Sequence, residues 1–173
     1  MTRYAAFLRG VNLGKRQVKS ADLLAAFQAM GFANVKTLLA SGNVLFDAEK
    51  ADARVIEAEL EQRFGFAIGT VLRTRTQLQA LVALDPFNGR SEDGDAKLYV
   101  TFVDDNDASS LPMPCALAGD FEVVKLTDSE VFMLAFRKPE GRFGPGMEMV
   151  SKHFGNKRLW TSRNWNTVLK AAQ

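Results

Sequence analysis

The chain has 173 residues, a length that suits one domain of ordinary size or two small packed halves. Hydrophobic residues make up 47% and charged residues 24%, as in soluble globular proteins, so disordered, collagen-like and low-complexity classes are excluded. The formal net charge is +2, so the chain as a whole has no strong electrostatic attraction for nucleic acid.

The cysteine content and the first residues bear on location. The single cysteine, Cys115, excludes an internal disulfide and a multi-cysteine zinc site. The apolar stretch before Arg9 is shorter than a signal-peptide core or a membrane span. We therefore expect a cytoplasmic protein that has no membrane partner and carries no cofactor.

Apolar spacing in the first 73 residues predicts alternating strands and helices. We expect a buried strand at 4–8, a glycine-containing loop, a helix from an N-cap at Ser20 to Gly31, a hairpin at 35–39 and 44–46, a helix at 51–64 and a strand at 68–72. This β-α-β-β-α-β order is that of the ferredoxin-like unit, an antiparallel sheet with two helices on one face.

The second half repeats strands and helices less regularly. We expect a short helix from Thr76 to Leu84, strands at 97–103, 122–126 and 131–136, a helix at 147–154, and a final helix at about 163–171 capped by Thr161 or Ser162. Residues 104–119 lack periodicity and predict a loop with one helical turn at most. The prediction is an α+β protein with a ferredoxin-like half, residues 1–84, and a second, smaller α+β half, residues 85–173.

Charge is distributed unevenly along the chain. Residues 1–84 carry 11 basic and 7 acidic groups, residues 85–130 carry 3 and 11, and residues 131–173 carry 8 and 2. An acidic middle therefore separates two basic ends. In a structural or interaction module, the acidic middle would bind the basic ends within one chain or between the subunits of a homo-oligomer, whereas in a binding module the basic ends would bind a partner.

Three stretches of the sequence have a distinctive composition: Arg9-Gly10-Val11-Asn12-Leu13-Gly14-Lys15, Ser41-Gly42-Asn43-Val44 and Thr161-Ser162-Arg163-Asn164-Trp165-Asn166-Thr167-Val168. Together they resemble the bacterial domain of unknown function 1697 family. The resemblance covers essentially the whole chain and implies a cytoplasmic α+β protein with a ferredoxin-like N-terminal part. It implies no established activity. The family often has tyrosine and glutamine where this chain has Leu38 and Ala40.

The loop after the first strand resembles a phosphate-binding loop, since Gly14 and Lys15 follow a strand and precede a helix. The spacing Gly10-x-x-x-Gly14-Lys15 is one residue shorter than the G-x-x-x-x-G-K-[ST] pattern of nucleotide-hydrolysing proteins. Arg16 also stands where that pattern has a serine or threonine hydroxyl, so we expect no nucleoside triphosphate hydrolysis. Its glycines can expose N–H groups beside basic residues and bind one anionic group. The alternative is a solvated connection between two elements.

The two other motifs each have two interpretations. Ser41-Gly42-Asn43 is either a structural turn or a source of neutral donors for a pocket. Arg163 and Asn164 are expected in the first turn of the final helix, where the helix dipole disfavours a cation. Arg163 would therefore pair with a carboxylate of the acidic middle or with a bound phosphate.

Catalytic and metal sites have little support in the sequence. His153 is the only histidine, and no basic residue near Cys115 would lower the pKa of its thiol. The aspartates at 104–107 lack the glycine and closing glutamate of a calcium-binding loop, so we expect no metal.

The leading functional hypothesis is a module that binds a phosphate-bearing ligand, a nucleotide or a nucleic acid. The expected ligand-binding residues are Arg9, Asn12, Lys15, Ser41, Asn43, Arg163 and Asn164. The basic side chains would pair with charge, and the amides and the hydroxyl would orient the ligand. The alternatives are an enzyme that acts on a phosphorylated or nucleotide substrate, and a structural or protein-interaction module with no small-molecule ligand.

Overall fold

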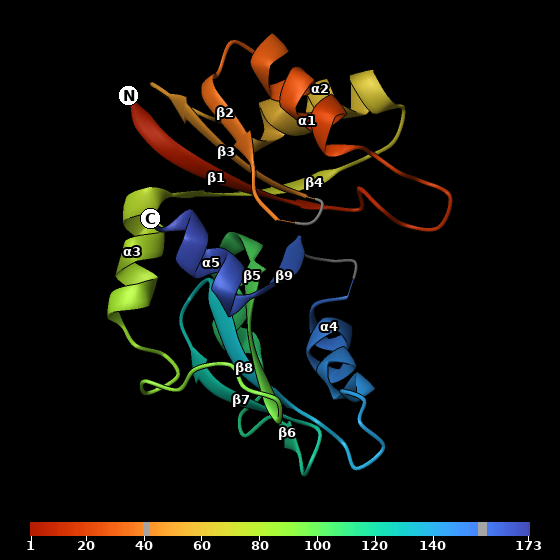
Figure 1. Cartoon of the computed structure of the whole chain (residues 1–173), viewed down its shortest axis with the longest axis vertical. Helices are drawn as coiled ribbons and strands as arrows, with labels where there is room; N and C mark the ends of the chain where they lie inside the picture. The colour runs from red at the N-terminus through yellow and green to blue at the C-terminus, as the bar shows by residue number, and fades with distance from the viewer. Residues whose placement is uncertain (40–41, 156–158) are drawn as a thin grey trace. The chain divides into compact units, whose positions relative to one another are not determined.

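The computed structural model describes residues 1–39, 42–155 and 159–173, which form two compact units (Figure 1). Unit 1 consists of Met1–Ala80 and Leu169–Gln173, and unit 2 consists of Leu81–Val168. Helices accompany an antiparallel sheet in each unit, so the predicted α+β class is confirmed. None of the helices in the described residues has the length and hydropathy needed to cross a bilayer.

Unit 1 follows the predicted β-α-β-β-α-β order. Its elements are β1 (Thr2–Arg9), α1 (Ser20–Ala29), β2 (Ala33–Thr37), β3 (Asn43–Ala48), α2 (Ala53–Phe64) and β4 (Gly69–Thr74), and α3 (Arg75–Ala83) begins in the same unit. The strands are ordered β2-β3-β1-β4, with β1 antiparallel to both β3 and β4.

The core of unit 1 lies where α1 and α2 pack on one face of this sheet. Phe46 of β3 is fully buried, and its ring centroid lies 5.4 Å from that of Phe27 on α1 and 4.3 Å from that of Phe32. Ile56 and Leu60 of α2 are buried in the same cluster. Their spacing of four residues puts both side chains on one side of the helix, which explains the apolar pattern of the sequence.

The two helices are capped in different ways. At α2, the Asp52 side chain accepts a hydrogen bond from the N–H of Arg54 at 2.8 Å, and Gly65 ends the helix with φ +82°. At α1 the predicted cap was wrong. Lys19 occupies the N-cap position with extended backbone, its carbonyl accepts from Leu23, and Ser20 is the first helical residue.

Unit 2 contains the less regular part of the chain. Its strands are β5 (Ala96–Val103), β6 (Ala116–Leu117), β7 (Phe121–Leu126), β8 (Glu130–Phe136) and β9 (Trp160–Asn164), in the order β6-β7-β8-β5-β9. Its helices are α4 (Glu148–Phe154) and the start of α5 (Trp165–Ala171), and 3-10 turns form at Asp104–Asn106, Ala108–Ser110 and Pro145–Met147.

Strand β9 corrects the prediction for the last motif. Residues 160–164 pair antiparallel with β5, with Ser162 opposite Thr101 and their hydroxyl oxygens 2.6 Å apart. The helix begins only at Trp165, and Asn164 caps it because its Oδ1 accepts from the N–H of Asn166 at 2.9 Å. The predicted caps, Thr161 and Ser162, are therefore strand residues.

Aromatic packing anchors α5 in unit 2. The ring centroid of Trp165 lies 5.4 Å from that of Phe87 and 5.8 Å from that of Phe132, both in edge-to-face orientation. All three side chains are buried. Edge-to-face contacts at this distance add to the stabilisation that comes from burial alone, so this cluster holds the start of α5 in place.

A buried carboxylate fixes the segment after β8. Asp120 is 2% exposed, accepts from the N–H of Gly146 at 2.9 Å and pairs with Lys138 Nζ at 3.1 Å. A Cβ atom at Gly144 or Gly146 would overlap the carboxylate. Glycine is therefore required at both positions, because the backbone has to approach Asp120 closely.

Candidate functional site

The sheet of unit 1 places two of the sequence motifs at one end. Strands β1 and β3 run antiparallel with Phe7 opposite Asn43, and the N–H of Leu8 donates to the carbonyl of Gly42 at 2.8 Å. Arg9, the last residue of β1, therefore lies beside the hairpin tip at which β3 begins. We call Arg9, the loop 10–19 and residues 38, 39, 42 and 43 the basic end of unit 1.

The loop 10–19 is anchored at both of its ends. Val11 and Val18 are each 5% exposed and belong to the core of unit 1. The Asn12 side-chain oxygen accepts from the N–H of Val18 at 3.3 Å and closes the neck of the loop. A turn forms farther out, where the N–H of Arg16 donates to the carbonyl of Leu13 at 2.9 Å. The loop is thus an ordered Ω-type loop that projects beyond the end of the sheet (Figure 1).

Four cations belong to this end of the sheet, in three different environments. Arg9 is half-buried, and desolvation lowers the pKa of its guanidinium. Lys15 and Lys19 are exposed. The Arg16 guanidinium lies over the ring of Phe66, 5.0 Å from its centroid. A charge that is partly removed from water is less screened, so Arg9 attracts an anion more strongly than an exposed cation does.

The hairpin tip is held by Asn43. Its side chain is 6% exposed and donates to the carbonyl of Leu38 at 3.1 Å, while the N–H of Leu38 donates to the carbonyl of Asn43 at 3.0 Å. Gly42 has φ +90°, a conformation that glycine adopts without strain. Ser41 lies outside the described residues. The side chain of Asn43 therefore holds the hairpin, as the structural interpretation predicted.

Sequence reasoning missed two exposed leucines at the basic end. Leu13 is 61% exposed and Leu39 is 51% exposed. Leu39 also has φ +55°, a left-handed conformation that costs an L-residue about 1–2 kcal/mol. A leucine placed immediately before a turn is a weak sequence signal, because its exposure and its backbone conformation become visible only in the structure.

The last motif forms a separate cluster within unit 2. The amide nitrogen of Asn164 donates to Glu92 Oε1 at 2.7 Å, and that of Asn166 donates to Glu92 Oε2 at 2.8 Å. The two amides thus bind both oxygens of one carboxylate. Glu92 belongs to the acidic middle, so two asparagines of the last motif contact a carboxylate of that segment.

Arg163 lies on β9 and not on a helix, so its predicted placement was wrong. Its Nη1 donates to Thr161 Oγ1 at 2.7 Å and to the carbonyl of Ser162 at 2.9 Å. Burial lowers the pKa of the guanidinium to about 10, a value at which the group is still charged at neutral pH. The side chain is therefore held against its own strand.

The predicted ligand-binding residues fall into two groups. Arg9, Asn12, Lys15 and Asn43 come together at the basic end of unit 1, joined by the pairing of β1 with β3 and by the loop that follows β1. Arg163 and Asn164 belong to unit 2. We place the candidate site at the basic end of unit 1.

The histidine of the chain has a serine partner. Ser110 Oγ lies 2.9 Å from His153 Nε2, a contact whose donor depends on the ring tautomer, and it also donates to the carbonyl of Asp107 at 2.7 Å. A serine nucleophile gives its hydroxyl proton to a histidine, whereas here a backbone carbonyl accepts from the hydroxyl.

The structure also bears on thiol and metal chemistry. Cys115 is 8% exposed, and desolvation raises the pKa of its thiol, which disfavours the reactive thiolate. Across the residues that the structure describes, no group of three or more histidine, cysteine, aspartate or glutamate side chains could hold a metal ion.

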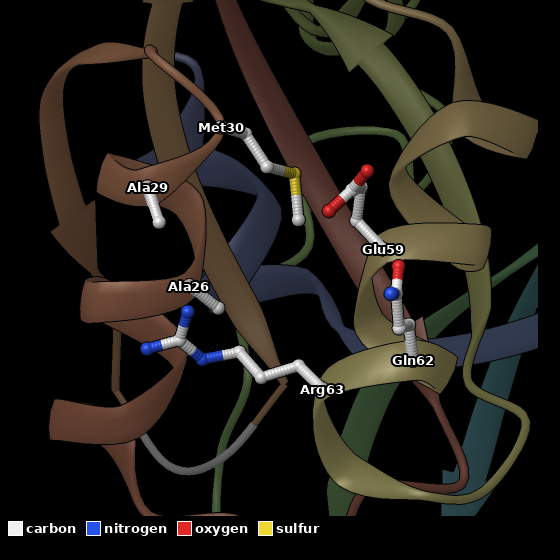
Figure 2. Close-up of a pocket in the computed structure, with 6 residues that line it drawn as sticks. All are labelled: Ala26, Ala29, Met30, Glu59, Gln62 and Arg63. Carbon is white, nitrogen blue, oxygen red and sulfur yellow. The ribbon is translucent and has the colours of Figure 1, made fainter.

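A hollow of about 240 Å³ lies between α1 and α2 (Figure 2). Its lining residues are Ala26 and Ala29 of α1, Met30 at the C-cap of that helix, and Glu59, Gln62 and Arg63 of α2. Figure 2 shows the long side chain of Arg63 extending from α2 toward α1. The hollow exists because the alanines of α1 leave space between the helices, and it contains none of the predicted ligand-binding residues.

The fold and the basic end define an α+β protein with two antiparallel sheets and a cationic loop cluster. The chain belongs to the DUF1697 family, described as protein of unknown function, whose model matches residues 1–132. This confirms the resemblance seen in the sequence, and the matched residues include the first two motifs.

The chain is also similar to a solved structure, that of conserved bacterial protein SP0830 from Streptococcus pneumoniae. The identity is 21% and the TM-score 0.67, and the match covers 99% of this chain and 97% of that chain. At this identity the similarity shows a shared fold. No match was found among curated proteins.

Proposed function

We propose that unit 1 binds a phosphate-bearing ligand at its basic end. The observation that carries the proposal is the pairing of β1 with β3, which sets Arg9 beside the hairpin tip at the point where the basic loop begins. Lys15 is exposed in the same loop. Guanidinium and ammonium groups bind phosphate oxygens through charge-assisted hydrogen bonds, so this end of the sheet suits an anion.

The residues of the site have distinct roles in this proposal. Arg9 supplies a partly desolvated charge, and Lys15 supplies a mobile point charge from the turn of the loop. Asn12 and Asn43 are positioning residues, because each uses its side chain to hold its own loop. Arg163 and Asn164 have partners inside unit 2, so the proposal rests on unit 1.

We further propose a cytoplasmic location. The chain's one cysteine, Cys115, is a buried free thiol. A reducing compartment suits a protein that relies on no disulfide.

Thermal unfolding in the presence of inorganic phosphate, tripolyphosphate and ATP tests the phosphate site. A ligand that binds the native state stabilises it by about 2.7 kcal/mol at a concentration one hundred times its Kd. Lys15→Ala should abolish most of the shift in melting temperature, because it removes one of the two charges that bind the phosphate in this proposal. Lys15 is exposed, so its removal leaves the core intact.

Lys50→Ala is the matched control. Lys50 is also an exposed lysine of unit 1, and it follows β3 at the opposite end of the sheet, where Ala48 lies beside Thr2. A shift that survives in Lys50→Ala and is lost in Lys15→Ala supports the site. The absence of any shift at millimolar ligand, or an equal loss in both variants, would contradict it.

A further inference from the structure

The cations of the basic end are separated along the loop. Arg9 and Lys19 flank the neck of the loop, which is closed by the hydrogen bond between Asn12 and Val18. Lys15 lies in the turn beyond the neck. A site for a single phosphate group has donors that converge on one point. A site for a chain of phosphates has cations spread along the chain. This distribution favours a polyanion over one isolated phosphate.

Two apolar side chains accompany these cations, and both are carried on ordered backbone. Leu13 accepts the hydrogen bond of its turn through its carbonyl. Leu39 follows Leu38, whose N–H and carbonyl both bond to Asn43. Leu39 has φ +55°, a conformation in which glycine or asparagine would be less strained than leucine. The fold nevertheless leaves the leucine 51% exposed. The Leu39 side chain is thus positioned for contact with another molecule.

Each leucine belongs to a segment that carries a cation or lies beside one. Leu13 is two residues from Lys15 in the sequence, and Leu39 precedes the hairpin tip beside which Arg9 lies. A strand of nucleotides has the complementary pattern, because each apolar base face is followed by a phosphate. Leucine is able to contact bases, because architectural proteins insert aliphatic side chains, leucine among them, between the base steps of duplex DNA and use arginine and lysine in the adjoining groove.

We infer that the ligand of the basic end is single-stranded nucleic acid, whose phosphates pair with Arg9, Lys15 and Lys19 and whose bases contact Leu13 and Leu39. This inference rests on the proposed function and names its ligand class. Because aliphatic side chains rather than hydrogen bonds meet the bases, the binding is tolerant of sequence and dominated by salt-sensitive phosphate contacts.

The test is fluorescence anisotropy with a labelled oligothymidylate of about 12 nucleotides, within the usual site sizes of roughly 4–16. Affinity should fall with salt, and Lys15→Ala should reduce the slope of log K against log salt by about 0.7, the value for one lost single-strand phosphate contact. Leu13→Gln and Leu39→Gln should each weaken binding about five-fold, the loss expected if about half of one leucine side chain is removed from water in the complex, and should leave this slope unchanged.

Two controls come from the opposite end of the sheet. Lys50→Ala should keep the wild-type salt slope, and Val55→Gln, which alters a residue that is 59% exposed near the start of α2, should keep the wild-type affinity. An abasic strand of the same length should bind with the same salt slope and show no effect of either leucine variant. Circular dichroism melts of every variant verify that each remains folded.

The outcomes separate this inference from the proposed function. If ATP or tripolyphosphate shifts the melting temperature and the oligonucleotide does not bind, the inference is overturned and the phosphate site stands. If the oligonucleotide binds with no loss in the leucine variants, the base contacts are overturned. Leucine-dependent binding to vesicles of anionic phospholipid, without binding to the strand, would also overturn it. Failure of every phosphate compound would remove both proposals.

Discussion

The backbone N–H of Gly146 donates a 2.9 Å hydrogen bond to Oδ1 of Asp120, a carboxylate that also pairs with Lys138. Lys138 lies near the start of the connection between β8 and α4, and Gly146 lies near its end. A single buried carboxylate therefore fastens both ends of this connection, which also contains an antiparallel bridge between Arg137 and Phe143 and a short 3-10 turn.

Gly146→Ala should lower the free energy of unfolding by about 1–3 kcal/mol, because a Cβ there would overlap the Asp120 carboxylate and crowd the Phe121 ring. Urea unfolding measures the change. Gly94→Ala in the same unit is the control, since no atom lies within 4 Å of its added Cβ and its effect should stay within about 0.5 kcal/mol. Equal effects at the two positions would refute the close approach.

Glu92→Gln should lower the pKa of Tyr99. Burial raises the pKa of this tyrosine first, and the negative charge of Glu92 adds to it. Removing the charge should therefore bring the pKa part of the way back toward 10.0, and burial should keep it above that value. The chain has two tyrosines, so ultraviolet titration in a Tyr4→Phe background isolates Tyr99. An unchanged pKa would place Glu92 outside the electrostatic environment of the ring.

Tyr99 also predicts how stability depends on pH. The pKa of Tyr99 in the folded protein is raised above the usual tyrosine value of 10.0, so folding favours the neutral phenol. This contribution is fully present below the unfolded pKa and is lost as pH rises through the folded pKa. Stability measured between pH 9 and 11 should thus fall less steeply in Tyr99→Phe than in the parent protein, and parallel curves would contradict the assignment.

Cys115 should react slowly with thiol reagents in the native protein. Its side chain is buried, and desolvation raises the pKa of the thiol, so little thiolate is present at pH 8. Absorbance with a disulfide reagent gives the rate, which should rise to that of a free thiol in urea. Since this is the one cysteine, the same rate reports opening of unit 2 around it. Fast labelling in buffer would show that the thiol is accessible.

Leu39→Asn should increase stability by up to about 1 kcal/mol, because asparagine adopts the left-handed conformation at lower cost than leucine. The midpoint of urea unfolding checks this. If Leu39 contacts nucleotide bases, the same variant should bind an oligonucleotide more weakly, so that stability and binding change in opposite directions. A destabilised variant would show that the Leu39 side chain has a packing role in the fold.

The sequence was sufficient to predict most of unit 1, because its helices show strong apolar periodicity and clear terminal signals. Asp52 and Gly65 mark the ends of α2, and Ile56 and Leu60 mark its buried side. The cap of α1 was missed, because a serine that could cap a helix can equally begin one, and only the backbone conformation of Lys19 distinguishes the two cases.

The last motif was harder to predict for a physical reason. The strand Trp160–Asn164 is short, lies at the edge of its sheet and is specified by pairing with β5, which no local pattern reveals. The contact between Asn164 and Glu92 likewise joins residues that are 72 positions apart. The sequence predicted a carboxylate or phosphate partner for Arg163 and no carboxylate partner for Asn164, because no local pattern links Asn164 to a residue so far away in the chain.

The division of the chain into units has a consequence for folding. Gln79 donates through its side chain to the carbonyl of Ala172 at 3.0 Å, so unit 1 is closed by residues that follow the whole of unit 2. When unit 2 is folded, it shortens the effective loop that this contact closes, and when it is unfolded the loop is long and costs more entropy to close. Folding of unit 2 therefore lowers the entropy cost of closing unit 1. A mutation that unfolds unit 2 would destabilise unit 1 through chain connectivity alone.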